Sequence, residues 1–256
     1  MSRVALVTGG GTGIGAAVAR RLAADGYAVA VTGRRPGPIE EVARETGGLA
    51  VVADTGIAAD VERAVVETVT HFGGLDAIVL NAGIGGAGSL LDLEPATFES
   101  VFRTNVMGAF LTARAAMPHL LERRGAVVSI ASAAALRAAP GSLAYCSSKA
   151  ALAMLTQCIA LDNGPDGVRA NCLCPGWVRT PMADDEMDAL GIGQEEAYTL
   201  VTEDVPLRRP GSAGEIAGTV AWLLSEDASY VNGAVIPVEG GHTMVDVGTL
   251  AFGRVA

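Results

Sequence analysis

The stretch Val4-Ala-Leu-Val-Thr-Gly-Gly-Gly-Thr-Gly-Ile-Gly15 decides the fold of this chain. Its first five residues predict a short buried strand, and the apolar spacing that begins at Ile14 predicts a helix. Glycines in the loop between them let backbone amides approach a pyrophosphate, and the helix N-terminus adds a partial positive charge. A glycine-rich loop alone can be a tight turn without a ligand. Its position between the first strand and a helix predicts a nucleotide-binding site.

Further apolar runs follow along the chain and predict the other strands of a sheet. The predicted strands are Val4–Thr8, Ala28–Thr32, Leu49–Ala53, Ala77–Leu80, Ala126–Ala131, Arg169–Cys174 and Ala234–Val238. They are apolar throughout instead of alternating, which is typical of a parallel sheet covered on both faces.

Helical patterns lie between these runs. The predicted helices are Ile14–Ala24, Ala58–His71, Pro95–Glu122, Tyr145–Asp162 and Gly211–Leu224. Pro118 predicts a late bend in the longest of them. Strand–helix alternation with right-handed crossovers predicts an α/β fold, a Rossmann-type doubly wound parallel sheet of about seven strands flanked by helices.

The length of 256 residues suits one such sheet, so residues 1–256 are interpreted as a single dinucleotide-binding and catalytic domain. One stretch breaks the alternation, because Thr180–Pro210 is acidic, shows no strand pattern and is longer than most connections. Long segments of this kind often close over ligands. We expect a substrate lid at about residues 181–210.

The composition excludes several classes of partner. A net charge of −10 argues against a nucleic acid, which normally needs a basic surface. No apolar stretch is long enough to cross a bilayer, and the run Val4–Val7 enters the glycine-rich loop too soon for a secretory signal. The four cysteines form no CxxC pair and the chain has only three histidines, so we expect reduced, buried thiols and no metal. We therefore expect a cytoplasmic protein.

The loop has the spacing TGxxxGIG, and further motifs follow it. In order, they are Asp54 after the third strand, Asn81-Ala82-Gly83 after the fourth, Asn105, Ser132 after the fifth, Tyr145-x-x-x-Lys149, Pro175-Gly176 after the sixth, Thr180, and Gly240-Gly241 after the seventh. Together these motifs resemble the single-domain form of the short-chain dehydrogenase/reductase family over essentially the whole chain. One departure is Leu80, where many relatives carry a second Asn; we expect little consequence, because Asn81 keeps the amide.

The resemblance implies a nicotinamide dinucleotide cofactor and residues that hold it. It assigns Asp54 to the adenine ring, Asn81 and Gly83 to the floor of the site, and Val178 and Thr180 to the carboxamide. The predicted cofactor-binding residues are Gly9, Thr12, Gly13, Ile14, Gly15, Arg34, Arg35, Asp54, Asn81, Ala82, Gly83, Tyr145, Lys149, Pro175, Gly176, Val178 and Thr180.

The end of the second predicted strand bears on the choice of cofactor. An acidic residue there selects NAD, whereas a nearby arginine suits the extra phosphate of NADP. Gly33 stands where relatives place Asp, and Arg34 and Arg35 follow. Two guanidinium groups could hold the phosphate, so NADP(H) is favoured. The alternative is that both arginines are solvated and NAD(H) is bound through backbone groups.

Tyr145 and Lys149 are four residues apart on a predicted helix and project from the same face. A free tyrosine has a pKa of about 10, and a nearby ammonium would lower it enough for acid–base work. The resemblance implies that Lys149 also holds the nicotinamide ribose, that Asn105 supports a water chain, and that Ser132 bonds the reacting oxygen. The predicted catalytic residues are Asn105, Ser132, Tyr145 and Lys149.

Lys149 is also the only lysine in the chain, since every other basic residue counted with it is an arginine. A compact ammonium fits beneath a tyrosine and a ribose better than a planar guanidinium does. Chance placement of one remaining lysine is the alternative, but its coincidence with the motif favours a functional role.

The sequence favours reversible ketone or aldehyde/alcohol interconversion, in the form of NADPH-dependent reduction of a ketone or 3-oxoacyl-type carbonyl. The alternatives are an NAD-dependent secondary alcohol dehydrogenase of a degradative pathway and a non-catalytic nucleotide-sensing relative. An enoyl reductase matches less well, because its Tyr and Lys are more widely spaced.

A hydrophobic small-molecule substrate is expected from the residues around the predicted site. The candidate pocket residues are Ala133, Ala134, Leu136, Leu143, Trp177, Met182 and Met187. Most acids of the predicted lid are expected to face water, and His71, His119 and His242 are interpreted as surface or structural. The resemblance implies a homo-oligomer, a tetramer or dimer, in which the Asn105 and Tyr145 helices form one interface and the tail His242–Ala256 could pack on a neighbour.

Overall fold

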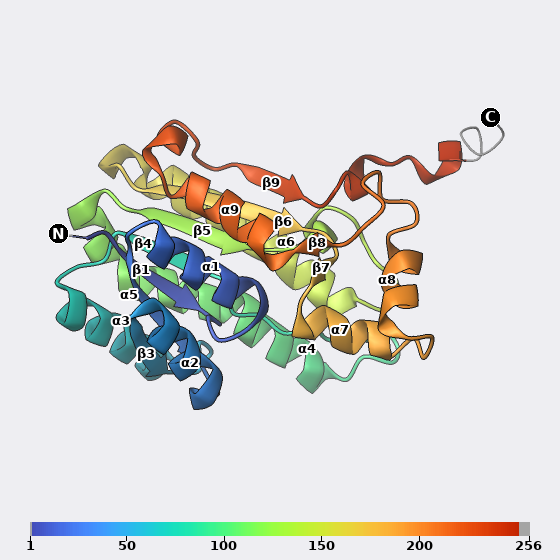
Figure 1. Cartoon of the computed structure of the whole chain (residues 1–256), viewed down its shortest axis with the longest axis horizontal. Coiled ribbons are helices and arrows are strands. Elements are labelled where there is room, and N and C mark those ends of the chain that lie inside the picture. Colours follow the sequence, from blue (N-terminus) through green and yellow to red (C-terminus); the bar gives the residue numbers. More distant parts are fainter. Residues whose placement is uncertain (1, 251–256) are drawn as a thin grey trace.

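The computed structural model of the protein describes residues 2–250 and has one seven-stranded sheet between two layers of helices (Figure 1). The sheet order is β3-β2-β1-β4-β5-β6-β9, and every neighbouring pair is parallel. The strands are β1 (Val4–Thr8), β2 (Ala28–Gly33), β3 (Leu49–Val52), β4 (Ala77–Leu80), β5 (Ala126–Ile130), β6 (Arg169–Pro175) and β9 (Val235–Val238). The doubly wound Rossmann-type fold is confirmed, and each predicted strand agrees to within one residue at either end.

Helices cover both faces of this sheet. They are α1 (Gly13–Ala24), α2 (Pro36–Thr46), α3 (Ala58–Phe72), α4 (Pro95–Phe102), α5 (Gly108–Arg123), α6 (Leu143–Asn163), α7 (Pro181–Asp188), α8 (Gln194–Val201) and α9 (Ala213–Leu223). Short turns of helix are η1 (Arg103–Met107), η2 (Ala133–Ala135), η3 (Gly164–Asp166), η4 (Glu226–Ala228), η5 (His242–Met244) and η6 (Val247–Thr249).

Alternate side chains of the strands feed two separate cores. In β1, Ala5 and Val7 pack with α1, α2 and α9, whereas Val4 and Leu6 pack with α3, α5 and α6. All five residues of β1 are buried, as are all five of β5. This burial on both faces explains why the strands are continuously apolar in sequence.

Helix α2 was not predicted. Its first turn, Pro36-Gly37-Pro38, has the composition of a loop. Proline is tolerated in the first turn of a helix, because the amide it lacks has no partner there. Buried Ile39 and Val42 then attach the helix to the sheet.

The long helix predicted at Pro95–Glu122 is interrupted near its start. Helices α4 and α5 are joined by η1, a π-helical turn that contains Asn105. Pro118 lies inside α5, which continues to Arg123. A π-turn shifts the register of the helix and often marks a functional position.

The connection between β6 and β9 extends beyond the carboxyl ends of the strands (Figure 1). It contains α7 and α8 but no strand between Thr180 and Pro210, as predicted, while β7 (Val178–Arg179) pairs with β8 (Gly211–Ser212) on either side of it. The two helices share a small hydrophobic core of Ala183, Met187, Ala197 and Tyr198. Because this core is separate from the two sheet cores, the α7–α8 segment is a distinct packing unit.

Candidate active site

A cleft of about 1840 Å³ lies at the carboxyl edge of the sheet. Ligands of doubly wound sheets bind at this edge, where neighbouring connections leave for opposite faces. All predicted cofactor residues except Gly15 line the cleft, and so do Ser132, Tyr145 and Lys149. Asn105 does not line it. The structure therefore brings residues from distant parts of the chain to one cavity.

The glycine loop has the shape of a cradle for an anion. Gly9 and Gly13 have positive φ angles of 63° and 54°, a conformation that favours glycine. A Cβ on Gly15 would lie 2.3 Å from the carbonyl oxygen of Gly9, so Gly15 keeps the loop closed and does not line the cleft. The side chain of Thr12 makes no capping hydrogen bond to α1, so the first backbone amides of α1 have no side-chain acceptor. This geometry fits the pyrophosphate of a dinucleotide.

Asn81 acts on the glycine loop itself. Its Nδ2 donates to the carbonyl oxygens of Thr8, at 2.9 Å, and Gly9, at 3.1 Å. Thr8 Oγ1 in turn accepts from the backbone amides of Asn81 and Ala82. The side-chain amide thus supports the floor of the cleft through the loop.

The other end of the cleft is basic at the end of β2. Arg34 and Arg35 are exposed and line the cleft after β2. Within residues 2–250, neither guanidinium has a hydrogen bond or an ion pair. Asp54 also lines the cleft, and its Oδ1 accepts from the Gly56 amide at 2.8 Å. Two available guanidiniums fit an additional phosphate.

Asn105 is fully buried and links three segments. Its Nδ2 donates to the Ile84 carbonyl oxygen and to Ser148 Oγ, both at 3.0 Å, and its Oδ1 accepts from the Ile84 amide at 2.8 Å. A Cβ on Gly83 would lie 3.2 Å from Lys149 Nζ and 3.3 Å from Asn105 Oδ1. Gly83 therefore permits the close approach of both side chains to the cleft floor.

Ser132, Tyr145 and Lys149 come from two neighbouring elements. Ser132 follows β5 and its Oγ accepts from the Ala134 amide at 3.1 Å, which caps η2. Tyr145 and Lys149 lie one turn apart in the first half of α6. Lys149 is 4% exposed, and its Nζ donates to the Ile130 carbonyl oxygen at 2.9 Å. Serine, tyrosine and lysine thus meet where β5 ends against α6.

The expected lowering of the tyrosine pKa is wrong for the chain by itself. Burial raises the pKa of Tyr145 above its ordinary value, a hydrogen bond with Ser132 opposes the rise, and the Glu186 carboxylate adds to it. Lys149 Nζ lies 5.6 Å from the centroid of the Tyr145 ring and is bonded to Ile130 instead. Desolvation of the phenolate therefore outweighs any help from the amine.

Burial also acts on the lysine. It lowers the pKa of Lys149 from 10.5 to about 8, because the buried ammonium loses its water. The thiols of Cys172 and Cys174 oppose this shift weakly. An amine that titrates near pH 8 can hold or release a proton under mild conditions.

The substrate side of the cleft is less apolar than predicted. Ala133, Ala134, Trp177, Met182 and Met187 line it, whereas Leu136 and Leu143 do not. The sequence reasoning missed the glycine-rich run at residues 84–88, Arg137 and Glu186, and it did not place His242 at the cleft. Glu186 stands four residues after Met182 in α7, and only the fold of that helix turns both toward the cavity.

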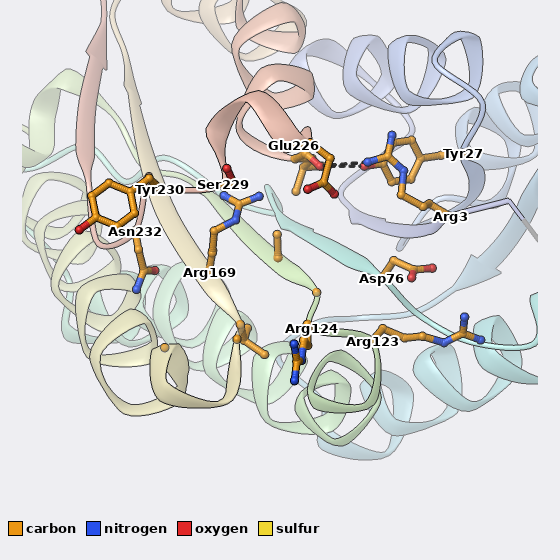
Figure 2. A pocket seen from close by; sticks show the side chains of 16 residues that line it. Arg3, Tyr27, Asp76, Arg123, Arg124, Arg169, Glu226, Ser229, Tyr230 and Asn232 are labelled. Atoms are coloured by element: carbon orange, nitrogen blue, oxygen red, sulfur yellow. Dashed lines mark hydrogen bonds between the residues drawn. The ribbon is translucent and has the colours of Figure 1, made fainter.

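A second pocket, of about 600 Å³, lies at the amino edge of the sheet (Figure 2). Arg3 packs over the Tyr27 ring there, 4.4 Å from its centroid, and Arg169 points toward Ser229 and Glu226. Four arginines and two acids, Asp76 and Glu226, line this pocket, and it contains no predicted catalytic or cofactor residue. The larger cleft is therefore the candidate active site.

Comparison with known proteins agrees with this geometry. A family model described as enoyl-(acyl carrier protein) reductase matches residues 9–243. The chain is 43% identical over 259 residues to protein MoaE of Klebsiella aerogenes, covering 98% of this chain and 100% of the relative. It is 40% identical over 255 residues to 2-(R)-hydroxypropyl-CoM dehydrogenase of Xanthobacter autotrophicus, with 96% and 100% covered. It is 34% identical over 248 residues to meso-2,3-butanediol dehydrogenase of Serratia marcescens, with 96% of each covered.

The chain belongs to the short-chain dehydrogenase/reductase family.

Solved structures of this family superpose closely on the chain. Levodione reductase has a TM-score of 0.91 at 35% identity, covering 95% of this chain and 98% of that one. An actinorhodin polyketide ketoreductase variant solved with NADPH has a TM-score of 0.91 at 31% identity, with the same shares covered. A 3-ketoacyl-(acyl-carrier-protein) reductase from Brucella melitensis solved with NADH has a TM-score of 0.86 at 30% identity, with 94% and 98% covered.

The family membership establishes the general chemistry. Like its relatives, the chain is an oxidoreductase that acts on CH–OH/C=O groups with a nicotinamide cofactor. Structures with NADPH and with NADH both occur among the neighbours. Across residues 2–250, no helix is both long and apolar enough to span a membrane.

The buried amine predicts a pH-dependent cost in stability. The folded chain binds the Lys149 proton less tightly than the unfolded chain, so the cost is complete below about pH 8 and disappears as pH rises toward 10.5. Lys149→Met should therefore raise the free energy of unfolding at pH 7 by up to about 3 kcal/mol, and by less at pH 9.5. Urea unfolding of both proteins at the two pH values measures this difference.

Lys149→Arg is the matched control, because it keeps the charge and should not stabilise the fold. Both variants should lose most turnover. A Lys149→Met protein less stable than the parent at pH 7 would show that burial of the ammonium does not destabilise the fold.

Proposed function

We propose that this protein reduces a ketone, or a 3-oxoacyl-type carbonyl, to a secondary alcohol with NADPH. One observation carries the proposal, namely that Ser132, Tyr145 and Lys149 line the same cleft as the glycine cradle and the two arginines. The bound cofactor would supply the hydride, and the chain's own residues would handle the proton and the orientation of the substrate.

Ser132 and Tyr145 would together hold the carbonyl oxygen. The raised pKa of Tyr145 keeps its phenol protonated through the neutral range, which suits donation of a proton to that oxygen during reduction. Lys149 Nζ lies 5.6 Å from the centroid of the Tyr145 ring, and its pKa of about 8 would suit it to return a proton to the phenol through a water molecule. Solvent would then replace the proton that the substrate takes up, by way of Lys149 and Tyr145.

Tyr145→Phe removes the proposed proton donor and little else. We expect kcat for reduction of a ketone panel to fall at least about 100-fold, because general acid catalysis contributes at that level. The dissociation constant for NADPH should be unchanged. Tyr230→Phe is the control, since Tyr230 is fully exposed and does not line the cleft.

The same panel tests the non-catalytic alternative. If the parent protein binds NADPH tightly yet oxidises it with no carbonyl compound, a nucleotide-sensing role replaces the enzymatic one. Equal turnover by Tyr145→Phe and the parent would contradict the assigned role of the phenol.

The preference for NADPH rests on Arg34 and Arg35. Loss of a charge-assisted hydrogen bond costs about 1.5–3 kcal/mol, so Arg34→Ala should weaken NADPH binding about 10- to 100-fold. Binding of NADH should change about twofold or less. Titration of each cofactor against protein fluorescence measures both constants, with Arg44→Ala as the control because Arg44 is exposed on α2 outside the cleft.

An equal effect on both cofactors would contradict the phosphate-binding role. Tighter binding of NAD(H) than of NADP(H) by the parent would favour the alternative, an NAD-dependent secondary alcohol dehydrogenase of a degradative pathway.

We propose that the chain forms a homo-oligomer, a dimer or a tetramer, because apolar side chains of two helices are exposed. Phe110 on α5 and Met154 and Leu161 on α6 are 42%, 59% and 77% exposed. Met154 and Leu161 are seven residues apart and share one face of α6. A second copy of the chain would cover this face, in line with the interface expected for the helices of Asn105 and Tyr145.

Met154→Glu with Leu161→Glu should shift the protein to a smaller species, because buried carboxylates oppose association. Light scattering coupled to size exclusion gives the mass. Val66→Glu on α3 is the control, with 59% exposure outside the proposed face. A parent protein that is already monomeric at micromolar concentration would contradict the proposal.

A further inference from the structure

Glu186 is a carboxylate of the cleft that the proposed mechanism does not use. It lies near the end of α7, in the α7–α8 segment, and lines the cleft together with Met182, Ala189 and Leu190. The same helix brings Met182 and Met187 to the substrate side of the cleft, and the Glu186 carboxylate adds to the rise in the pKa of Tyr145. Although the residue is exposed toward the cleft, the surrounding protein raises the pKa of its carboxyl.

Three other acids of the same segment have partners nearby. Asp184 accepts from Tyr198 Oη at 2.7 Å, and Asp188 accepts from Gln194 Nε2 at 3.0 Å. Glu195 forms a bidentate ion pair with Arg179, in which each Nη lies 2.6 Å from one carboxylate oxygen. Among residues 2–250, no hydrogen bond or ion pair reaches the Glu186 carboxylate. Partial desolvation of a carboxylate without a partner costs free energy, and a donor on a ligand would offset that cost.

The cations of the cleft are not placed to neutralise Glu186. Arg34 and Arg35 line the end that follows β2, Lys149 donates to Ile130, and Arg137 donates to the Thr243 carbonyl oxygen at 2.5 Å. Asp54 and Asp204 are the other acidic residues of the lining in the described part of the chain. Within residues 2–250, Glu186 is thus left without a cationic partner in the cleft.

We propose that Glu186 selects the substrate by its second functional group. The preferred substrate is a small ketone or alcohol that carries a hydroxyl or ammonium donor near the reacting carbon, and substrates with an anionic group in that position are rejected. This inference rests on the proposed function, because it concerns the same cleft. It adds one polar contact to a pocket whose other candidate walls are mainly apolar.

Four ketones with the same methyl ketone end test the proposal. They are butanone, 4-hydroxy-2-butanone, 4-amino-2-butanone and 3-oxobutanoate. For the parent protein with NADPH, kcat/KM should be highest for the hydroxyl and ammonium ketones and lowest for the anion. In Glu186→Gln the ammonium ketone should lose about tenfold in kcat/KM and the anion should gain about tenfold, while butanone should change about twofold or less.

Asp185→Asn is the matched control, since Asp185 is the exposed neighbour on α7 and does not line the cleft. It removes the same charge and should leave the four values unchanged. Equal melting temperatures for the three proteins show that the segment remains folded.

The two proposals fail in different ways. Turnover of these ketones with no dependence of Glu186→Gln on their charge, or an effect equal to that of Asp185→Asn, overturns the role of Glu186 alone. Binding of NADPH without turnover of any carbonyl compound by the parent overturns the proposed reductase and this inference with it.

Discussion

The hydrogen-bonded link between the ends of β1 and β4 positions the rest of the cleft. Thr8 Oγ1 donates to the Val79 carbonyl oxygen and accepts from the backbone amides of Asn81 and Ala82, which follow β4. The Asn81 side-chain amide in turn donates to the carbonyl oxygens of Thr8 and Gly9, where the glycine loop begins. The two strands are direct neighbours in the sheet. Because their connections leave toward different helix layers, a crevice opens above this link, and the glycines allow the backbone to line it.

On one wall of that crevice, burial raises the free energy of charged side chains. Lys149 and the phenol of Tyr145 lie in a protein environment that disfavours their charged forms. Each group has a partner within the fold, since the Ile130 carbonyl oxygen accepts from the amine and Ser132 forms a hydrogen bond with the phenol. Such an arrangement is expected to be less stable than an apolar one. It keeps the phenol protonated, as its proposed role of proton donor requires.

The α7–α8 segment forms the outer wall of the cleft and is held together by its own interactions. Tyr198 lies at its centre, buried between the two helices, and Arg179 stacks on its ring at 4.4 Å while pairing with Glu195. Thr180 caps α7 and stands against Gly13 of the glycine loop. The segment therefore contacts the glycine loop at one end and brings Glu186 to the cleft along its length. Its action as a substrate lid remains a proposal.

Continuous apolar strands, alternation with helices and motif spacing determined the fold and most of the lining of the cleft from sequence, because these features depend on local periodicity and on the common edge where parallel strands end. Sequence could not show that Pro36 begins a helix, because that helix is stabilised by the packing of Ile39 against residues that are distant in the chain. It could not show the π-turn at Asn105 or that the Glu186 side chain faces the cleft, because both depend on packing between elements. The pKa of Tyr145 was also decided by tertiary structure, because desolvation arises from all the atoms that surround a group, not from the amine one helical turn away.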